Sequence, residues 1–244
     1  MDKELTLLAY RKYMIDRVSK RRRRSRLHTI LYFLAGVIAA YYLFVVLALI
    51  GLRSIDPFTT GVQTQRRIES WFSKKNYQKR YSFVSLSHIS AHLQWAVIAA
   101  EDGRFYEHHG FEWNQIEVAL KEKTQHKRVR GASTISQQLV KNLFFTTHAS
   151  YLRKGVEASI VPLAELILGK KRILEIYLNV IEWGPGVYGA EAAAQYHFHM
   201  PAQRLDRYHA ANLAAVLPAP RRWNPAHMND YSAIILERME QLGR

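Results

Sequence analysis

The sequence predicts a mainly α-helical protein with one N-terminal transmembrane helix, and three features support that fold class. Apolar residues recur at helical spacing through most of the chain after Ser87. A long apolar run at residues 29–52 precedes them, and no series of alternating apolar and polar residues indicates a sheet. With 244 residues, the chain has room for one globular domain of ordinary size besides that run.

Residues 1–28 form a strongly basic tail. The tail contains ten Lys or Arg residues against three Asp or Glu, and the whole chain carries a formal net charge of +15. A basic cluster can bind nucleic acid, but next to a long apolar run it is better explained by membrane topology and anionic lipid headgroups. We therefore expect the membrane, and no nucleic acid, as the partner of this tail.

Residues 29–52 are predicted to be a transmembrane helix. They include no Asp, Glu, Lys or Arg, and at about 1.5 Å per residue such a helix can cross a bilayer core of roughly 30 Å. A cleaved signal peptide is the alternative, but its apolar region would be shorter and a small-residue cleavage site would follow, whereas Arg53-Ser54-Ile55-Asp56-Pro57 follows here. Because cations crowd the N-terminal flank, we expect a single-pass protein of the cytoplasmic membrane, with a cytoplasmic N-terminus and the rest on the outer, periplasmic side.

The remainder divides into a juxtamembrane connector at residues 53–79, with a short helix at 65–72, and a globular domain at 80–244. Apolar periodicity predicts helices in this domain at 88–100, 113–123, 134–144, 151–168, 171–180, 189–198, 204–216 and 231–242. The chain has no cysteine, which excludes disulfides, thiolate metal sites and thiol nucleophiles.

The first candidate for chemistry is the acidic pair Glu101-Asp102, which follows the apolar run 95–100. A carboxylate at the end of a packed helix can be partly desolvated, which raises its pKa toward the range of a catalytic acid or base. Taken alone, such a pair is more often a solvated surface feature. His108 and His109 follow without a further ligand at zincin-like spacing, so we expect a hydrogen-bonding role for His108 and not a metal site.

A second polar cluster begins at residue 133. Thr134 and Gln137 have the spacing of a capping box, so Ser133 or Thr134 should start a helix. Two pairs one turn apart would then form a polar face, with the apolar residues packed behind it: Gln137 with Lys141, and Gln138 with Asn142. Spacing alone favours an ordinary amphipathic surface helix, and a face directed into a cleft is the functional alternative.

A third cluster places Arg153, Lys154 and Glu157 on one helix face. An intrahelical ion pair, worth a few tenths of a kcal/mol, is the simple explanation. The alternative is an anion site in which Glu157 orients the cations or helps to hold a divalent metal. A basic segment upstream would form a loop beside the same site or a solvated surface loop: Lys121, Lys123, Lys127, Arg128 and Arg130.

Four blocks follow one another along the chain in this order: Glu101-Asp102-Gly103-Arg104-Phe105-Tyr106-Glu107-His108-His109-Gly110, Gly131-Ala132-Ser133-Thr134-Ile135-Ser136-Gln137-Gln138-Leu139-Val140-Lys141-Asn142, Arg153-Lys154-Gly155-Val156-Glu157, and Lys171-Arg172-Ile173-Leu174-Glu175-Ile176-Tyr177-Leu178-Asn179. Together they resemble the peptidoglycan glycosyltransferases, which polymerise lipid II into the glycan strands of the bacterial cell wall. The resemblance covers residues 80–225, including a glycine-containing loop at 183–189 and a last block at 213–225. Its departures are mild, with Ala132 and Ser136 in place of the common glycine and threonine.

The resemblance implies a lysozyme-like helical glycosyltransferase domain. The growing polyprenyl-diphosphate-linked glycan would be the donor, and the GlcNAc 4-hydroxyl of lipid II would attack it, giving an inverted β-1,4 link and free polyprenyl diphosphate. Glu101 would be the catalytic base and Glu157 a second catalytic carboxylate, while Glu175 and Asn179 would mainly hold the wall of the site. Substrate-binding roles are expected for Asp102, Phe105, His108, Ser133, Thr134, Gln137, Gln138, Lys141, Asn142, Arg153 and Lys154.

The resemblance also allows a divalent cation, Mg²⁺ or Mn²⁺, with Glu157 as candidate ligand, and divisome or penicillin-binding proteins as partners. Neither Ser-x-x-Lys nor Lys-Thr-Gly occurs, so we expect a monofunctional enzyme without transpeptidase activity. The alternatives are a lysozyme-like lytic glycosidase, which would shorten glycans, and a non-catalytic membrane-anchored cell-wall scaffold, which would not need two carboxylates.

Overall fold

The computed structural model describes residues 2–73, 77–115, 117–118 and 133–244. The chain divides into two compact units, Met1–Ala48 and Leu49–Arg244. The basic segment predicted at 121–130 lies outside the described residues. Of the helix predicted at 113–123, the described residues 113–115 and 117–118 are helical.

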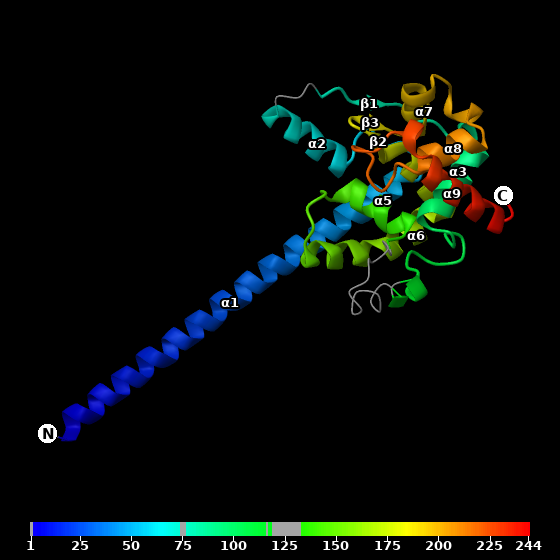
Figure 1. The fold of residues 1–244 in the computed structure, drawn as a ribbon. Coiled ribbons are helices and arrows are strands. Elements are labelled where there is room, and N and C mark those ends of the chain that lie inside the picture. Colours follow the sequence, from blue (N-terminus) through cyan, green and yellow to red (C-terminus); the bar gives the residue numbers. More distant parts are fainter. Residues whose placement is uncertain (1, 74–76, 116, 119–132) are drawn as a thin grey trace. The chain divides into compact units, whose positions relative to one another are not determined.

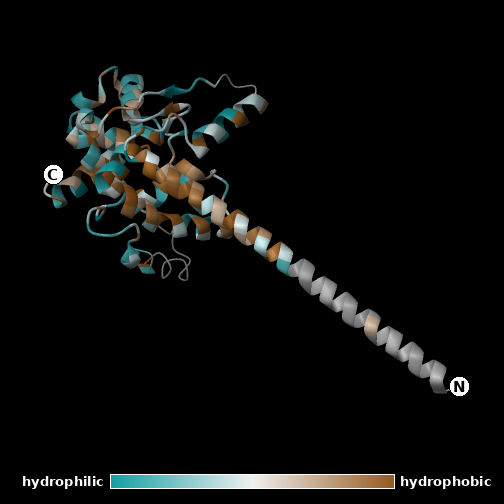
Figure 2. Cartoon of the chain, turned by 180° about the vertical axis from the view of Figure 1, so that it is seen from behind, coloured by the Kyte–Doolittle hydropathy of each residue, from teal (hydrophilic) through white to brown (hydrophobic). Residues whose placement is uncertain are grey.

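The chain begins with one long helix, α1 (Asp2–Leu52), which includes both the predicted tail and the predicted membrane span (Figure 1). Within it, the 25 residues His28–Leu52 have a mean hydropathy of 2.6 and are long and apolar enough to cross a bilayer. Large apolar side chains such as Tyr32 and Phe33 are exposed along this stretch, and Figure 2 shows its apolar colouring. The length and composition therefore agree with the predicted membrane anchor.

The second unit is mainly helical, as predicted. Its α-helices are α2 (Gly61–Phe72), α3 (Ala91–Glu101), α5 (Ile135–Phe144), α6 (Tyr151–Val180), α7 (Ala190–Phe198), α8 (Arg207–Ala214) and α9 (Asn229–Gln241). Three short 3₁₀ helices connect them, η1 (Leu86–His88), η2 (Ala202–Arg204) and η3 (Pro225–His227). The helix predicted at 204–216 is divided, because Asp206 caps α8 with its carboxylate on the His209 N–H and leaves η2 as a separate turn.

Helix α3 lies in the core of this unit. It packs against α8 and α9, while α5 packs along α6. Leu93, Ala96, Val97 and Ile98 are buried on α3, so the helix that ends at Glu101 is fixed on several sides. Burial of this many apolar side chains makes the end of α3 a rigid place for a functional group.

Helix α6 contains a break at Gly169, where the backbone has φ 70° and ψ 162°. A positive φ strains residues other than glycine, and the break falls between the two helices predicted at 151–168 and 171–180. The two predicted helices therefore correspond to the two halves of α6. Glu157 lies on the first half and Tyr177 on the second.

A small three-stranded sheet corrects the prediction that the domain has no strands. Strands β1 (Arg80–Tyr81), β2 (Glu182–Gly184) and β3 (Val187–Tyr188) have the order β1-β3-β2, with β1 parallel and β2 antiparallel to β3. Strands of two or three residues are too short to produce a recognisable alternation in sequence. Gly186 turns the β2–β3 hairpin at φ +76°, where a Cβ atom would come within 2.6 Å of the Gln78 carbonyl oxygen.

Candidate active site

Glu101 is the last residue of α3, and its carboxylate is held by a chain of two hydrogen bonds. The Gln138 Nε2 amide donates to Glu101 Oε2 at 2.7 Å, and the Tyr177 hydroxyl donates to Gln138 Oε1 at 2.9 Å. Because the tyrosine proton occupies the amide oxygen, the amide NH₂ is directed toward Glu101. This arrangement suits an ionised carboxylate, and it uses only one of the two Glu101 oxygens.

Burial raises the pKa of the Glu101 carboxyl above its ordinary value. The hydrogen bond from Gln138 and the positive charges of Lys141 and Arg238 act in the opposite direction, while the neighbouring Asp102 adds to the rise. This agrees with the direction of the pKa shift predicted from the sequence. A carboxylate with a raised pKa is a stronger base than an exposed glutamate.

The segment after Glu101 is fastened to the N-terminus of α5 through Asp102. Asp102 Oδ2 accepts from the Ile135 N–H at 3.0 Å, and Asp102 Oδ1 lies 2.8 Å from His108 Nε2. His108 Nδ1 accepts from the Gly110 N–H at 3.0 Å, so the ring proton belongs on Nε2 and is donated to Asp102. His108 therefore has the hydrogen-bonding role predicted for it, inside the protein.

Thr134 and Gly110 complete this attachment. The Thr134 hydroxyl donates to the Gly110 carbonyl at 2.7 Å and accepts from the Gln137 N–H at 3.2 Å, so Thr134 is the predicted N-cap of α5. Gly110 has φ +94°, and a Cβ atom there would collide with the Val161 side chain of α6. The loop thus lies directly on α6, and no larger residue fits at this point.

Several residues predicted to bind substrate are instead used within the fold. Phe105 is fully buried, with the Lys170 ammonium 4.4 Å from its ring centroid, so its side chain has no surface for a substrate contact. Asp102 and Thr134 are also buried, and their polar atoms are bonded to protein groups. Their contacts show a positioning function, which sequence spacing could not distinguish from direct binding.

Helix α5 buries Ile135 and Leu139 on its apolar side, as predicted. On its other side Lys141 is partly exposed, whereas Gln137 is buried and Asn142 donates from Nδ2 to the Gln138 carbonyl at 2.8 Å. Ser133, just before the helix, is partly exposed. The polar face is therefore mixed, with Lys141 and Ser133 accessible and the two amides turned inward.

Lys141 interacts electrostatically with both candidate carboxylates, Glu101 and Glu157. Burial lowers the pKa of its ammonium group, and the charges of Arg153 and Lys154 lower it further. The carboxylates of Glu157 and Glu101 act through space in the opposite direction. The partly buried ammonium of Lys141 thus interacts electrostatically with both carboxylates, although they lie on different helices.

Glu157 is buried on the first half of α6, where Lys154 Nζ donates to its Oε1 at 2.8 Å. The other oxygen, Oε2, has no hydrogen-bond partner among the described residues. On the same helix, Arg153 Nη1 donates to the Thr146 carbonyl at 2.8 Å. Its Nε is buried and also lacks a partner in the described part of the chain.

Of these two unpartnered atoms, the carboxylate oxygen Glu157 Oε2 is the one that can be a ligand of the predicted metal. Among the described residues no three His, Asp or Glu side chains come together to hold an ion. Mg²⁺ commonly binds one or two carboxylates together with substrate phosphates, so Glu157 Oε2 is compatible with a metal brought by a diphosphate. The arrangement does not provide a complete protein site.

Glu175 and Asn179, expected to be structural, fix the second half of α6 to the chain before α3. Glu175 Oε1 accepts from the Leu86 N–H at 2.7 Å. Asn179 bonds both backbone groups of Val84, each at 2.9 Å. Tyr177 lies between them on the same helix and supports Gln138, so this block holds the wall against which Glu101 is positioned.

Sequence reasoning missed two neighbours of Glu101. Tyr177 was given no functional role from the sequence, but its hydroxyl fixes the orientation of Gln138. Arg238 of α9 donates to the Ala99 carbonyl at 3.5 Å, near the end of α3, and lowers the pKa of Glu101. The tyrosine belongs to a recognised block and could have been found there, whereas nothing in the sequence near Arg238 indicates its proximity.

Two buried carboxylates and a partly buried ammonium on a helical framework define an enzyme-type site suited to proton transfer and to an anionic leaving group. The transglycosylase family model matches residues 66–240. The chain therefore belongs to the transglycosylase family. The match begins within α2, inside the segment predicted as a connector.

Curated relatives support the same assignment. The chain is 45% identical over 202 residues to a biosynthetic peptidoglycan transglycosylase of Pseudomonas syringae pv. syringae, covering 81% of this chain and 86% of the relative. It is 49% identical over 197 residues to the protein of the same name from Aeromonas hydrophila subsp. hydrophila, covering 79% and 83%. With the Pseudomonas entomophila protein, also of this name, the identity is 45% over 226 residues, covering 91% and 92%.

Proposed function

We propose that this protein is a monofunctional peptidoglycan glycosyltransferase that polymerises lipid II into β-1,4-linked glycan strands. The observation that carries the proposal is the buried Glu101, held through one oxygen by Gln138 and lying in the electrostatic reach of Lys141. Family membership and the names of the relatives support the same reaction.

Glu101 acts as the general base. The sugar hydroxyl that attacks the donor is a weak nucleophile, because its pKa lies far above 7, and it needs a positioned acceptor for its proton. Glu101 Oε2 is bonded to Gln138, which leaves Oε1 to take the proton from the GlcNAc 4-hydroxyl of lipid II. The C–O bond to the donor diphosphate breaks as the new glycosidic bond forms, so a single displacement inverts the anomeric carbon.

The leaving group is polyprenyl diphosphate, and its developing charge needs cations. Lys141 and Lys154, which both interact with Glu157, supply ammonium groups, and the unpartnered Nε of Arg153 supplies a further donor. Glu157 keeps these cations in place through its bond to Lys154. A divalent cation, Mg²⁺ or Mn²⁺, would add charge neutralisation at the diphosphate, with Glu157 Oε2 as its protein ligand.

The protein is anchored by the apolar part of α1, with its N-terminus in the cytoplasm and the catalytic unit on the periplasmic side. The support is the 25-residue apolar span together with the basic residues on its N-terminal flank. An anchor of this kind keeps the site near a lipid-linked substrate. Divisome and penicillin-binding proteins are proposed partners, since cross-linking of the product requires a separate activity.

The test is incubation of detergent-solubilised protein with labelled lipid II, followed by gel separation of the products. Wild-type protein should give a ladder of long glycans. Shortening of added glycan strands would identify a lytic glycosidase instead, and a folded protein that neither builds nor cuts glycans would identify a scaffold.

A further inference from the structure

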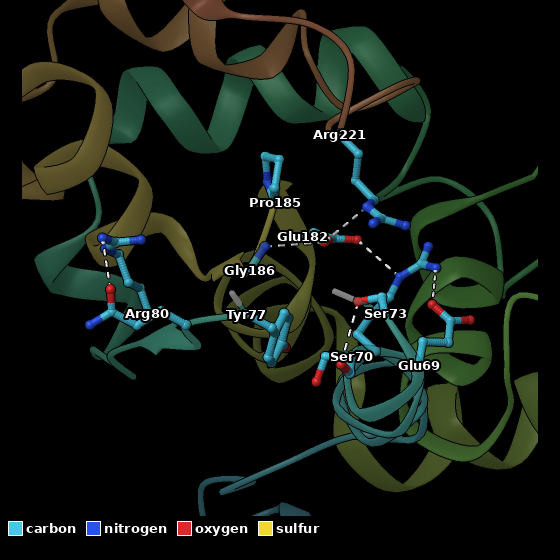
Figure 3. Close-up of a pocket in the computed structure, with 11 residues that line it drawn as sticks. Glu69, Ser70, Ser73, Tyr77, Arg80, Glu182, Pro185, Gly186 and Arg221 are labelled. Atoms are coloured by element: carbon cyan, nitrogen blue, oxygen red, sulfur yellow. Dashed lines mark hydrogen bonds and ion pairs between the residues drawn. The ribbon is translucent and has the colours of Figure 1, made fainter. Parts of the chain in front are cut away.

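The structure has a polar pocket of about 550 Å³, whose lining residues are drawn in Figure 3. Its walls come from α2, the segment leading into β1, the β2–β3 hairpin and the loop after α8. None of Glu101, Lys141 or Glu157 lines it. The pocket is large enough for several residues of an extended ligand.

Three guanidinium groups line this pocket, from Arg66, Arg80 and Arg221, against two carboxylates, from Glu69 and Glu182. A second hollow of about 270 Å³ shares Arg66, Glu182 and Arg221 and adds Arg222 to its wall. The pocket and its extension therefore carry more positive than negative charge.

Several guanidinium donors in the pocket are incompletely used. Arg80 lies over the Tyr196 ring, 5.0 Å from its centroid, and donates to the neutral Gln78 amide oxygen at 3.2 Å, and no carboxylate of the described residues pairs with it. Arg221 is half exposed and lies 3.9 Å from Glu182, beyond hydrogen-bond distance. The buried Nε of Arg66 has no hydrogen-bond partner among the described residues, although Glu182 lies 3.5 Å away.

The same wall also offers acceptors. Glu182 is mostly buried, lies 3.5 Å from Arg66 and 3.9 Å from Arg221, and accepts from the Gly186 N–H at 3.4 Å. Figure 3 shows Glu182 beside Arg221 and Gly186. Guanidinium groups recognise carboxylates and phosphates through paired hydrogen bonds. A phosphate group offers only acceptors and would give Glu69 and Glu182 no donor, whereas a peptide presents carboxylates to the arginines and N–H groups to the glutamates.

We propose that this pocket binds an acidic peptide, namely the carboxylate-bearing peptide carried by the peptidoglycan strand. The proposal rests on the proposed function, since peptidoglycan is a glycan with peptides attached to its sugars. Arg80 and Arg221 hold the peptide carboxylates, and Glu182 accepts from peptide N–H groups. The pocket would thereby recognise the substituents of the strand while the sugars are joined elsewhere.

The experiment measures binding of a purified disaccharide–peptide from digested peptidoglycan to the full-length protein in detergent, by calorimetry. The Arg80→Gln/Arg221→Gln variant should bind it at least about tenfold more weakly than wild type, because charge-assisted hydrogen bonds are lost. Arg204→Gln is the matched control, since Arg204 is exposed and lies outside both hollows. Circular dichroism and the single Arg80→Gln variant establish that loss of binding is not loss of folding.

Two further probes make the result specific. The same fragment with its carboxylates methyl-esterified should bind weakly to both proteins, and the peptide-free disaccharide should not distinguish them. Equal binding of the disaccharide–peptide by wild type and double variant, or its failure to bind wild type, would overturn the proposal. So would a double variant that loses only its binding to vesicles of anionic phospholipid, which would identify a lipid site. Lipid II polymerisation by wild type is scored separately, so failure of the proposed function is distinguishable.

Discussion

Glu101 and Glu182 are two mostly buried glutamates, and burial raises the pKa of both. At Glu101 the chief opposing influence is a hydrogen bond from the neutral Gln138 amide. At Glu182 it is the charge of Arg66, with Gly186 and Arg221 contributing. The first carboxylate keeps a free oxygen that can take a proton, whereas the second is a fixed counter-charge among arginines, so the neighbours of a buried carboxylate decide its chemistry.

The substitution Glu101→Gln tests most directly whether Glu101 is the general base. The amide cannot accept a proton as a carboxylate does, so polymerisation of lipid II should fall about 10³-fold, within the range of general base catalysis. Gel analysis of labelled lipid II measures the rate. Glu107→Gln is the control, because Glu107 is exposed and pairs only with Arg104 among the described residues. Near-normal turnover by Glu101→Gln would remove Glu101 from the role of base.

The next largest effect is expected from Lys141→Met, which removes the ammonium that both carboxylates sense. Loss of one electrostatic group at a developing charge should lower the rate about 10²-fold. Because Lys141 lowers the pKa of Glu101, the acidic limb of the pH–rate profile should also move to higher pH. An unchanged profile would show that Lys141 does not act on Glu101.

A smaller effect is expected from Tyr177→Phe, which removes only the hydroxyl that fixes Gln138. The rate should fall about tenfold, because one hydrogen bond contributes on the order of 1 kcal/mol and the Gln138 amide becomes free to turn. The acidic limb should again move upward as the ionised form of Glu101 loses a secure donor. A drop in rate without that movement would point to a packing role for Tyr177.

The smallest effect concerns stability. The pKa of Glu101 in the folded protein is raised above the ordinary 4.5, so the folded protein binds the proton more tightly than the unfolded chain does. The free energy of unfolding therefore falls as the pH rises from 4.5 to the pKa of Glu101 in the folded protein. At pH 7 Glu101→Gln should therefore be at least as stable as wild type, and the difference should vanish near pH 4. Urea unfolding at the two pH values measures it, and a variant less stable at pH 7 would contradict the assigned shift.

Much of the fold and part of the site could be predicted before the structure. Helical periodicity located α3, α5, α7 and α9 within a few residues. Ser133 or Thr134 was expected to start α5, and Thr134 is its N-cap; a hydrogen-bonding role was expected for His108, which bonds Asp102. These features depend on residues within one or two turns of each other, so the sequence contains the information directly.

The failures have a shared cause. Phe105 was expected to contact substrate and is fully buried. The strands were missed because each is two or three residues long. In each case a contact with a distant segment decided the outcome.

The sequence by itself determined the apolar span, the helical class of the domain and its membership of the transglycosylase family. Only the tertiary structure decided that Tyr177 orients Gln138 toward Glu101, and that Arg66, Arg80, Glu182 and Arg221 meet in one pocket. The physical reason is that periodicity and capping are local properties of the chain. Burial, pKa shifts and pairing of charges depend on which distant segments pack together.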